Sequence, residues 1–193
     1  MEGNPLFPIF VKVDQTNILV VGGGFVGTEK VGALLKNDPR AAITIVARDI
    51  SAELKQLVAD KPQIRLLERP FMWDDLDGRD LLFLATDNPK LHEEIKPVAK
   101  KRGLLTNVAD TPHLCDFYLG STVKKGDLKI GISTNGKSPT LAKRIKEFLN
   151  EELPDNTQQL LDNLREIRDR LKGNLEEKIK VLDGVTEDWL KKN

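Results

Sequence analysis

The sequence has little of several residue types, and each shortage excludes a class of structure or partner. One cysteine in 193 residues excludes an intramolecular disulfide, and two histidines leave few ligands for a closed zinc site. The 30 basic and 30 acidic residues cancel, so no net charge attracts nucleic acid or a membrane surface. No apolar run approaches the roughly 18 residues of a membrane span, and the first residues carry no signal pattern. We therefore expect a cytoplasmic protein with neither nucleic-acid nor membrane partners.

Apolar runs that alternate with helical patterns predict the fold class, which is α/β. Strands that alternate with helices favour a parallel sheet with right-handed crossovers. Five apolar runs are predicted to be strands of this sheet: 18–21, 42–47, 64–67, 81–85 and 104–109. They define a Rossmann-type domain over residues 1–112, a fold whose members commonly bind a dinucleotide such as NAD.

The pattern changes after residue 112. Two short strands around the turn at 124–127 predict a β-hairpin, and Ser138-Pro139 predicts the start of a helix, with serine as N-cap and proline at the first helical position. We expect a small α/β segment for dimerisation and substrate binding over 113–150. Residues 151–193 are predicted to form a helical C-terminal domain.

A glycine cluster directly follows the first strand run. Gly22, Gly24 and Gly27 have the G-x-G-x-x-G spacing of a dinucleotide-binding turn. The first glycine permits the tight turn, the second lets the pyrophosphate approach the backbone, and the third allows close helix packing. A helix N-terminus then offers free N–H groups to the anion. We expect the whole turn to bind the cofactor: Gly22, Gly23, Gly24, Phe25, Val26 and Gly27. The alternative is an ordinary α/β turn without a ligand.

The residues after the second strand bear on the choice of cofactor. Asp49 lies about 20 residues beyond the glycines, where an acid can bind the adenosine ribose of NAD. Its neighbour Arg48 is the residue type that holds the additional phosphate of NADP. We expect NAD, bound in part by Asp49.

Two further polar turns follow strands of the predicted sheet. Ligands of open α/β sheets bind beyond the carboxyl ends of the strands. Thr86, Asp87 and Asn107 are therefore expected to bind the cofactor. Asp110, after the last strand, is the expected catalytic residue, because a carboxylate near the nicotinamide can accept the proton lost in an oxidation. The alternative is that Asp110 only caps the following turn.

Residues 124–146 contain seven basic residues and one acidic residue, a local charge of +6 in a neutral protein. This stretch predicts a site for a polyanionic substrate, and a solvated surface is the alternative. His92 lies on a mostly polar helix and is expected at the surface. His113 and Cys115 are two potential metal ligands, but known sites need three or more, so we expect no metal site.

The chain resembles the precorrin-2 dehydrogenase/sirohydrochlorin ferrochelatase family, the dehydrogenase module of siroheme synthase, over residues 1–152. Four motifs in this order carry the resemblance: Val21-Gly22-Gly23-Gly24-Phe25-Val26-Gly27 with Lys30, Leu84-Ala85-Thr86-Asp87-Asn88, Asn107-Val108-Ala109-Asp110, and Ile132-Ser133-Thr134-Asn135-Gly136-Lys137-Ser138-Pro139 leading to Leu141-Ala142-Lys143-Arg144. The chain departs from the family at Thr111, where many members have a second aspartate, and at Gly120-Ser121, where Pro-Ala is usual.

The resemblance implies a function in siroheme biosynthesis. Family members oxidise precorrin-2 to sirohydrochlorin with NAD, and some also insert Fe2+ to give siroheme. The resemblance places Asp110 in both reactions and implies a homodimer. Since the tetrapyrrole substrate carries eight carboxylates, it accounts for the basic stretch. The expected substrate-binding residues are Ser133, which is phosphorylated in some relatives, with Lys137, Ser138, Lys143 and Arg144. The alternative function is a non-catalytic NAD-binding regulatory module.

Overall fold

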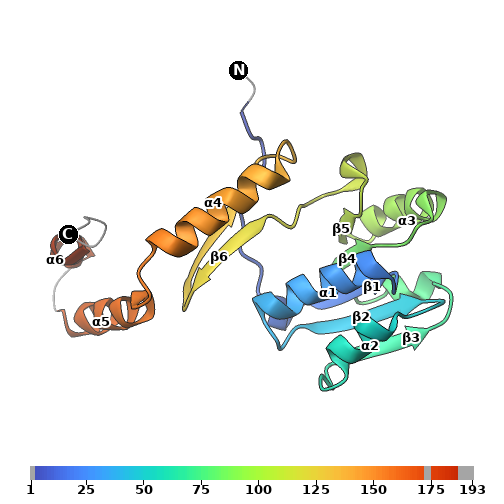
Figure 1. The fold of residues 1–193 in the computed structure, drawn as a ribbon, viewed down its shortest axis with the longest axis horizontal. Helices are drawn as coiled ribbons and strands as arrows, with labels where there is room; N and C mark the ends of the chain where they lie inside the picture. The colour runs from blue at the N-terminus through green and yellow to red at the C-terminus, as the bar shows by residue number, and fades with distance from the viewer. Residues whose placement is uncertain (1–2, 172–174, 187–193) are drawn as a thin grey trace. The chain divides into compact units, whose positions relative to one another are not determined.

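A computed structural model describes residues 3–171 and 175–186 of the chain (Figure 1). It divides into two compact units, one formed by residues 9–119 and the other by residues 1–8 together with 120–193. None of the described helices is long and apolar enough to cross a membrane.

The unit 9–119 is built on a five-stranded sheet with the strand order β3-β2-β1-β4-β5. Every neighbouring pair of strands is parallel. The strands are β1 (Asn17–Val21), β2 (Ala42–Ala47), β3 (Ile64–Glu68), β4 (Leu81–Leu84) and β5 (Leu105–Val108). The predicted α/β class with a Rossmann-type parallel sheet is confirmed.

Helices cover both faces of this sheet, so its central strands are almost entirely buried and, apart from Asn17 and Thr44, apolar. On one face lie α1 (Phe25–Asn37) and α2 (Ala52–Val58), whose buried side chains pack on Ile18, Val20 and Ile43. On the other face lie α3 (Pro89–Lys101) and the short η2 (Trp73–Leu76), which pack on Leu19 and Leu82. The two faces make two hydrophobic clusters with the sheet between them.

The second unit begins with the predicted hairpin. The strands β6 (Ser121–Lys125) and β7 (Leu128–Ile132) pair antiparallel, and α4 (Pro139–Glu152) packs against them. The helices α5 (Thr157–Arg170) and α6 (Leu175–Thr186) follow, so the described part of the C-terminal segment is helical. Residues 172–174 and 187–193 of the predicted helical segment lie outside the described residues.

Candidate dinucleotide and catalytic site

The glycine turn between β1 and α1 is shaped by backbone packing. Gly22 has a φ of +125°, and a Cβ there would lie 2.5 Å from the carbonyl carbon of Ala85, at the end of β4. A Cβ on Gly27 would lie 3.0 Å from the carbonyl carbon of Gly22 and closer still to its oxygen. Both positions therefore admit only glycine without movement of the backbone. The second glycine of the motif is different, because nothing lies within 4 Å of where a Gly24 Cβ would stand.

The N-terminus of α1 is open at this turn. Gly24 is its N-cap and provides no side-chain cap, whereas Ser51, Asn88 and Ser138 cap α2, α3 and α4 with side-chain oxygens. The first α1 hydrogen bond runs from the Thr28 N–H to the Gly24 oxygen at 2.9 Å. The preceding amides of the first turn thus have no helical carbonyl partner, and the helix dipole favours an anion there. Phe25, the first residue of α1, is 84% exposed beside them.

The carboxyl ends of the central strands meet around this turn. The Gly22 N–H donates to the Val46 oxygen of β2, and the Ser51 N–H donates to the Gly23 oxygen, both at 2.9 Å. A Cβ on Gly23 would lie 2.6 Å from the backbone oxygen of Asp49. The exposed Asp49 is thereby held next to the turn. The strand order reverses between β1 and β4, and ligands of open α/β sheets bind at such a switch point.

The turn after β4 contains Thr86, whose backbone nitrogen lies 3.0 Å from the Cβ position of Gly22. The Thr86 hydroxyl is 2.8 Å from Nε2 of His92, on α3, and accepts from the Asn88 N–H at 3.3 Å. The expectation that His92 lies at the surface is wrong, since it is only 3% exposed. His92 lies on the buried side of α3 together with Ile95 and Ala99. The helical spacing of these three residues is hard to recognise in the sequence, because most other residues of the helix are polar. Burial lowers the pKa of His92, an effect that the nearby Asp87 partly opposes.

Asp110 stands just beyond β5 on an exposed turn. Its φ of 54° is left-handed, a conformation that aspartate tolerates better than most residues. The turn is closed by the Thr111 N–H, which donates to the Val108 oxygen at 3.4 Å. The expected catalytic carboxylate is therefore displayed at the carboxyl edge of the sheet.

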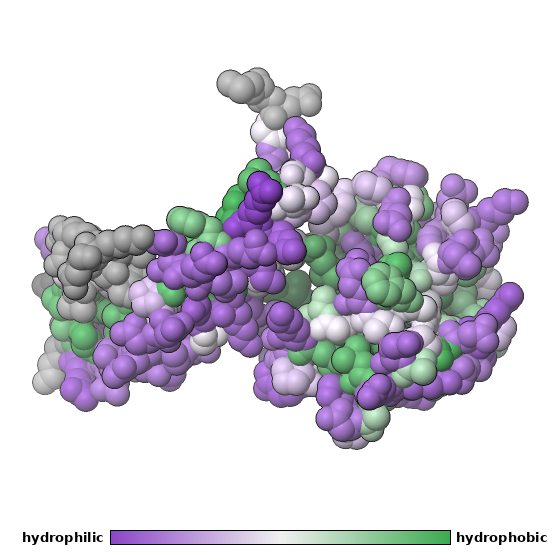
Figure 2. Space-filling model, in the orientation of Figure 1, coloured by the Kyte–Doolittle hydropathy of each residue, from purple (hydrophilic) through white to green (hydrophobic). Residues whose placement is uncertain are grey.

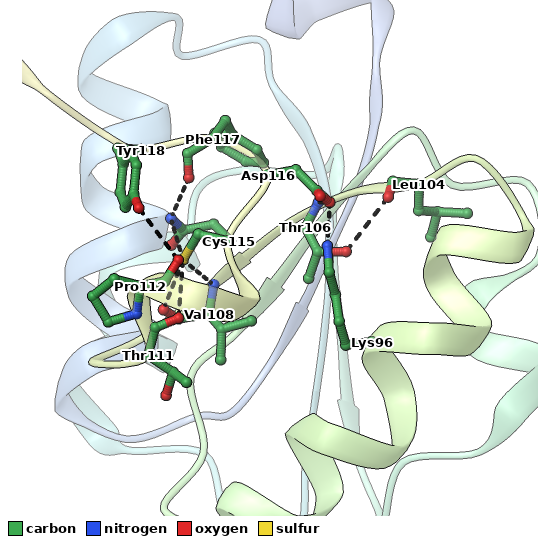
Figure 3. Close-up of polar contacts among 11 residues, drawn as sticks. Lys96, Leu104, Thr106, Val108, Thr111, Pro112, Cys115, Asp116, Phe117 and Tyr118 are labelled. Atoms are coloured by element: carbon green, nitrogen blue, oxygen red, sulfur yellow. Dashed lines mark hydrogen bonds and ion pairs between the residues drawn. The ribbon is translucent and has the colours of Figure 1, made fainter. Parts of the chain in front are cut away.

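Cys115 holds both ends of that turn (Figure 3). Its sulfur accepts from the Val108 N–H and donates to the Val108 oxygen, each at 3.2 Å, and reaches the Thr111 oxygen at 3.5 Å. The thiol thus provides hydrogen bonds to the backbone of Val108 that a neighbouring strand would otherwise provide, because β5 is the edge strand of the sheet. The sequence offers Cys115 as a potential metal ligand, and nothing in its seven-residue separation from Val108 indicates this contact.

The segment after Cys115 fastens the same edge. The Asp116 N–H donates to the Thr106 oxygen at 2.8 Å, and the Asp116 carboxylate accepts from the Thr106 N–H at 2.9 Å and pairs with Lys96 of α3 (Figure 3). The buried Asn107 amide donates to the Phe117 oxygen at 2.9 Å. This contact gives Asn107 a structural part, and its expected part in cofactor binding stays a prediction.

The expected substrate residues belong to the other unit, 1–8 with 120–193. The Ser138 hydroxyl accepts from the Leu141 N–H at 3.1 Å, which confirms the predicted N-cap of α4. The Ser133 hydroxyl contacts the side chain of Asn4 at 3.3 Å and accepts from the Asn135 N–H at 3.2 Å. Three exposed cations lie along the turn and the helix: Lys137, Arg144, and Lys143, which is 3.8 Å from Glu147.

No group of three or more His, Cys, Asp or Glu side chains gathers as a metal site among residues 3–171 and 175–186.

The hydrophilic surface is interrupted by hydrophobic patches (Figure 2). The exposed apolar side chains include Phe25 at the glycine turn, and Leu141 and Phe148 on α4.

Comparisons with known proteins agree with this geometry. Residues 9–121, more than half of the chain, match the sequence family described as NAD(P)-binding, and residues 125–152 match the central segment of sirohaem biosynthesis proteins. The chain therefore belongs to the NAD(P)-binding family, and its second unit is similar to the central segment of sirohaem biosynthesis proteins. The resemblance inferred from the motifs is thereby confirmed.

The relatives are siroheme synthases and a solved dehydrogenase. The siroheme synthase of Psychrobacter cryohalolentis is 33% identical over 95% of this chain, and that of Pseudoalteromonas atlantica is 34% identical over 97%. The chain spans only 34% and 42% of these two relatives. A solved structure named SirC, precorrin-2 dehydrogenase, is 27% identical and superposes with a TM-score of 0.76, covering 97% of this chain and 93% of that one.

Proposed function

We propose that this chain is a precorrin-2 dehydrogenase that oxidises precorrin-2 to sirohydrochlorin with NAD, in siroheme biosynthesis. The observation that carries the proposal is the uncapped α1 terminus at the switch point of the sheet, with an exposed carboxylate, Asp110, beyond a strand of the same sheet. The names of the siroheme synthases and of the solved precorrin-2 dehydrogenase support the substrate.

The oxidation removes two hydrogens from the macrocycle. Bound NAD would supply the acceptor for one of them, transferred with its electron pair as hydride, and the other leaves as a proton. We assign the pyrophosphate to the free amides of Phe25, Val26 and Gly27, and the adenosine ribose to Asp49. Asp110 takes the proton as general base. The products balance as sirohydrochlorin, NADH and one proton.

We assign the acidic groups of the tetrapyrrole to the basic stretch of the second unit. Lys137 and Arg144 are exposed cations that can meet carboxylates, and Ser133 and Ser138 lie on the same turn and helix start. Lys143 shares its charge with Glu147, so we expect it to contribute less. The +6 local charge is unusual in a chain whose total charge is zero, which favours an anionic ligand over a merely solvated face.

A homodimer is part of this proposal. The apolar positions of α4 divide between two sides: Ala142 is buried, whereas Leu141 and Phe148 are 51% and 59% exposed. A second copy that packs on this outer side, within residues 113–150, would cover them.

Insertion of Fe2+ into sirohydrochlorin is a further step that we propose for the same carboxylate. The macrocycle must lose pyrrole protons as the metal enters, and Asp110 is the exposed base beyond β5 that can accept them. The siroheme synthase names of the relatives support this step. A regulatory module that binds NAD without catalysis has no need of this carboxylate.

The test is anaerobic incubation of the purified chain with precorrin-2 and NAD. We expect sirohydrochlorin and NADH to form in equal amounts, and Asp110→Asn to abolish both while NAD still binds. A chain that binds NAD but forms neither product would instead be the regulatory module. Adding Fe2+ to the finished reaction then tests for siroheme.

A further inference from the structure

His92 is a buried histidine that the proposed reaction does not use. It lies one turn before Ile95 and two turns before Ala99 on the buried side of α3, and all three are at most 3% exposed. An apolar side chain would fill this position without needing a polar partner. Burying an imidazole there costs free energy unless it is hydrogen-bonded, so its partner is informative.

That partner is the Thr86 hydroxyl at the candidate cofactor site. The His92 Nε2 is 2.8 Å from the Thr86 oxygen, which also accepts from the Asn88 N–H at 3.3 Å. The Thr86 backbone in turn abuts Gly22, within the turn that we assign to the dinucleotide. His92 therefore contacts the side chain of Thr86, and the backbone of Thr86 lies next to the glycine turn.

The bonding capacity of a hydroxyl decides what this arrangement can do. A threonine oxygen accepts two hydrogen bonds and donates one. If the Asn88 N–H and a protonated His92 Nε2 occupy both acceptor positions, the threonine proton must point elsewhere. Thr86 is partly exposed, so a ligand or solvent can reach its side chain. An acceptor-rich ligand such as a pyrophosphate or ribose would then meet a donor.

We propose that His92 is a positioning residue, which donates from Nε2 to Thr86 and so presents the Thr86 hydroxyl as a hydrogen-bond donor to the dinucleotide. This inference rests on the proposed function, since it needs NAD at the glycine turn. Burial lowers the pKa of His92 and so favours the neutral ring, which carries one ring proton and has one tautomer that fits.

The first experiment is calorimetric titration of the full chain with NAD. We expect His92→Leu to weaken NAD binding about three- to tenfold, the range for the loss of one neutral hydrogen bond. His92→Gln keeps an amide donor near the Nε2 position and should recover most of the affinity. The matched control is His113→Leu, at the other, exposed histidine, which should leave NAD affinity unchanged.

A double-mutant cycle separates positioning from general destabilisation. Thr86→Val should weaken NAD binding, and adding His92→Leu to it should weaken binding no further, because the histidine acts through the hydroxyl. A histidine that only supports the fold would lower affinity by the same factor in both backgrounds, which would overturn the inference.

The tautomer is measured on the unmodified chain, so this arm does not depend on any variant folding. Nitrogen-15 NMR of the two histidine rings distinguishes Nε2–H from Nδ1–H, and we expect Nε2–H for His92 at neutral pH. An Nδ1–H ring, or His92→Leu with unchanged NAD affinity, overturns this inference and leaves the proposed function intact. A wild-type chain that binds no NAD overturns both.

Discussion

Gly22 and Gly24 are two residues apart, yet the structure predicts opposite effects of a side chain at each. A Cβ on Gly22 would stand 2.5 Å from the Ala85 carbonyl carbon, and the φ of +125° is one that other residues rarely adopt. A Cβ on Gly24 would stand in open space, in an extended backbone conformation that valine accepts. Gly22→Ala should therefore harm folding, and Gly24→Val should harm only binding.

The sizes of both effects can be worked out. A residue forced into such a backbone conformation costs about 1–3 kcal/mol, and the clash adds to this cost. At about 2–4 °C per kcal/mol for a chain of this size, Gly22→Ala should lower the melting temperature by about 2–12 °C or more. Gly24→Val weakens only the N-cap, at about 1 kcal/mol or less. If its side chain displaces the pyrophosphate from one amide, a charge-assisted bond of about 1.5–3 kcal/mol is lost, or about 10- to 100-fold in affinity.

The assay pairs thermal denaturation with calorimetric titration of NAD. Gly32→Ala is the matched control, because that helix position has only ordinary contact, at 3.9 Å from Leu57. It should leave the NAD affinity unchanged and should not lower the melting temperature. NAD affinity within threefold of wild type in Gly24→Val would refute the assignment of the pyrophosphate to this turn. An unchanged melting temperature in Gly22→Ala would refute the argument from the backbone contact.

Four further predictions follow from the site and its surroundings. Asp110→Asn should lower kcat for precorrin-2 oxidation about 10²–10⁴-fold at nearly unchanged NAD affinity, and a loss below tenfold would make the residue structural. Cys115→Ala should lower kcat and speed amide exchange at 108–111, whereas Cys115→Ser, which keeps a donor and an acceptor, should do so less. Equal exchange in both variants would contradict the role given to the hydrogen bonds of Cys115 with Val108 and Thr111. Because burial lowers the pKa of His92, the unfolded chain binds more protons than the folded chain below about pH 6.5. The free energy of unfolding, measured with urea, should therefore fall as the pH drops through that value, and His92→Leu should make it depend less on pH. Parallel curves for the two proteins would argue against this role of His92. Light scattering should give twice 21.6 kDa at micromolar concentration, reduced towards one copy by Phe148→Glu, and a wild-type monomer would refute the proposed dimer.

Short-range patterns in the sequence predicted most of the fold. The apolar runs at 18–21 and 81–85 indicated strands buried on both faces, because only a parallel sheet covered on both sides tolerates such runs. The glycine spacing located the turn at Gly22, and Ser138-Pro139 located the start of α4. These features depend on residues within a few positions of one another, where backbone sterics and capping act. The same motifs also predicted the resemblance to siroheme synthases that the comparisons confirm.

The tertiary structure alone decided which distant residues meet. The contacts of Gly22 with Ala85 and of Cys115 with Val108 join segments that no local pattern connects, since they depend on strand order and on how a loop returns to an edge strand. His92 shows the same limit: its helix is polar overall, and only the packing of α3 on the sheet reveals that this one imidazole is buried against Thr86. Sequence determines what each segment can form, whereas the partner of a buried polar group is set by the packing of the whole unit.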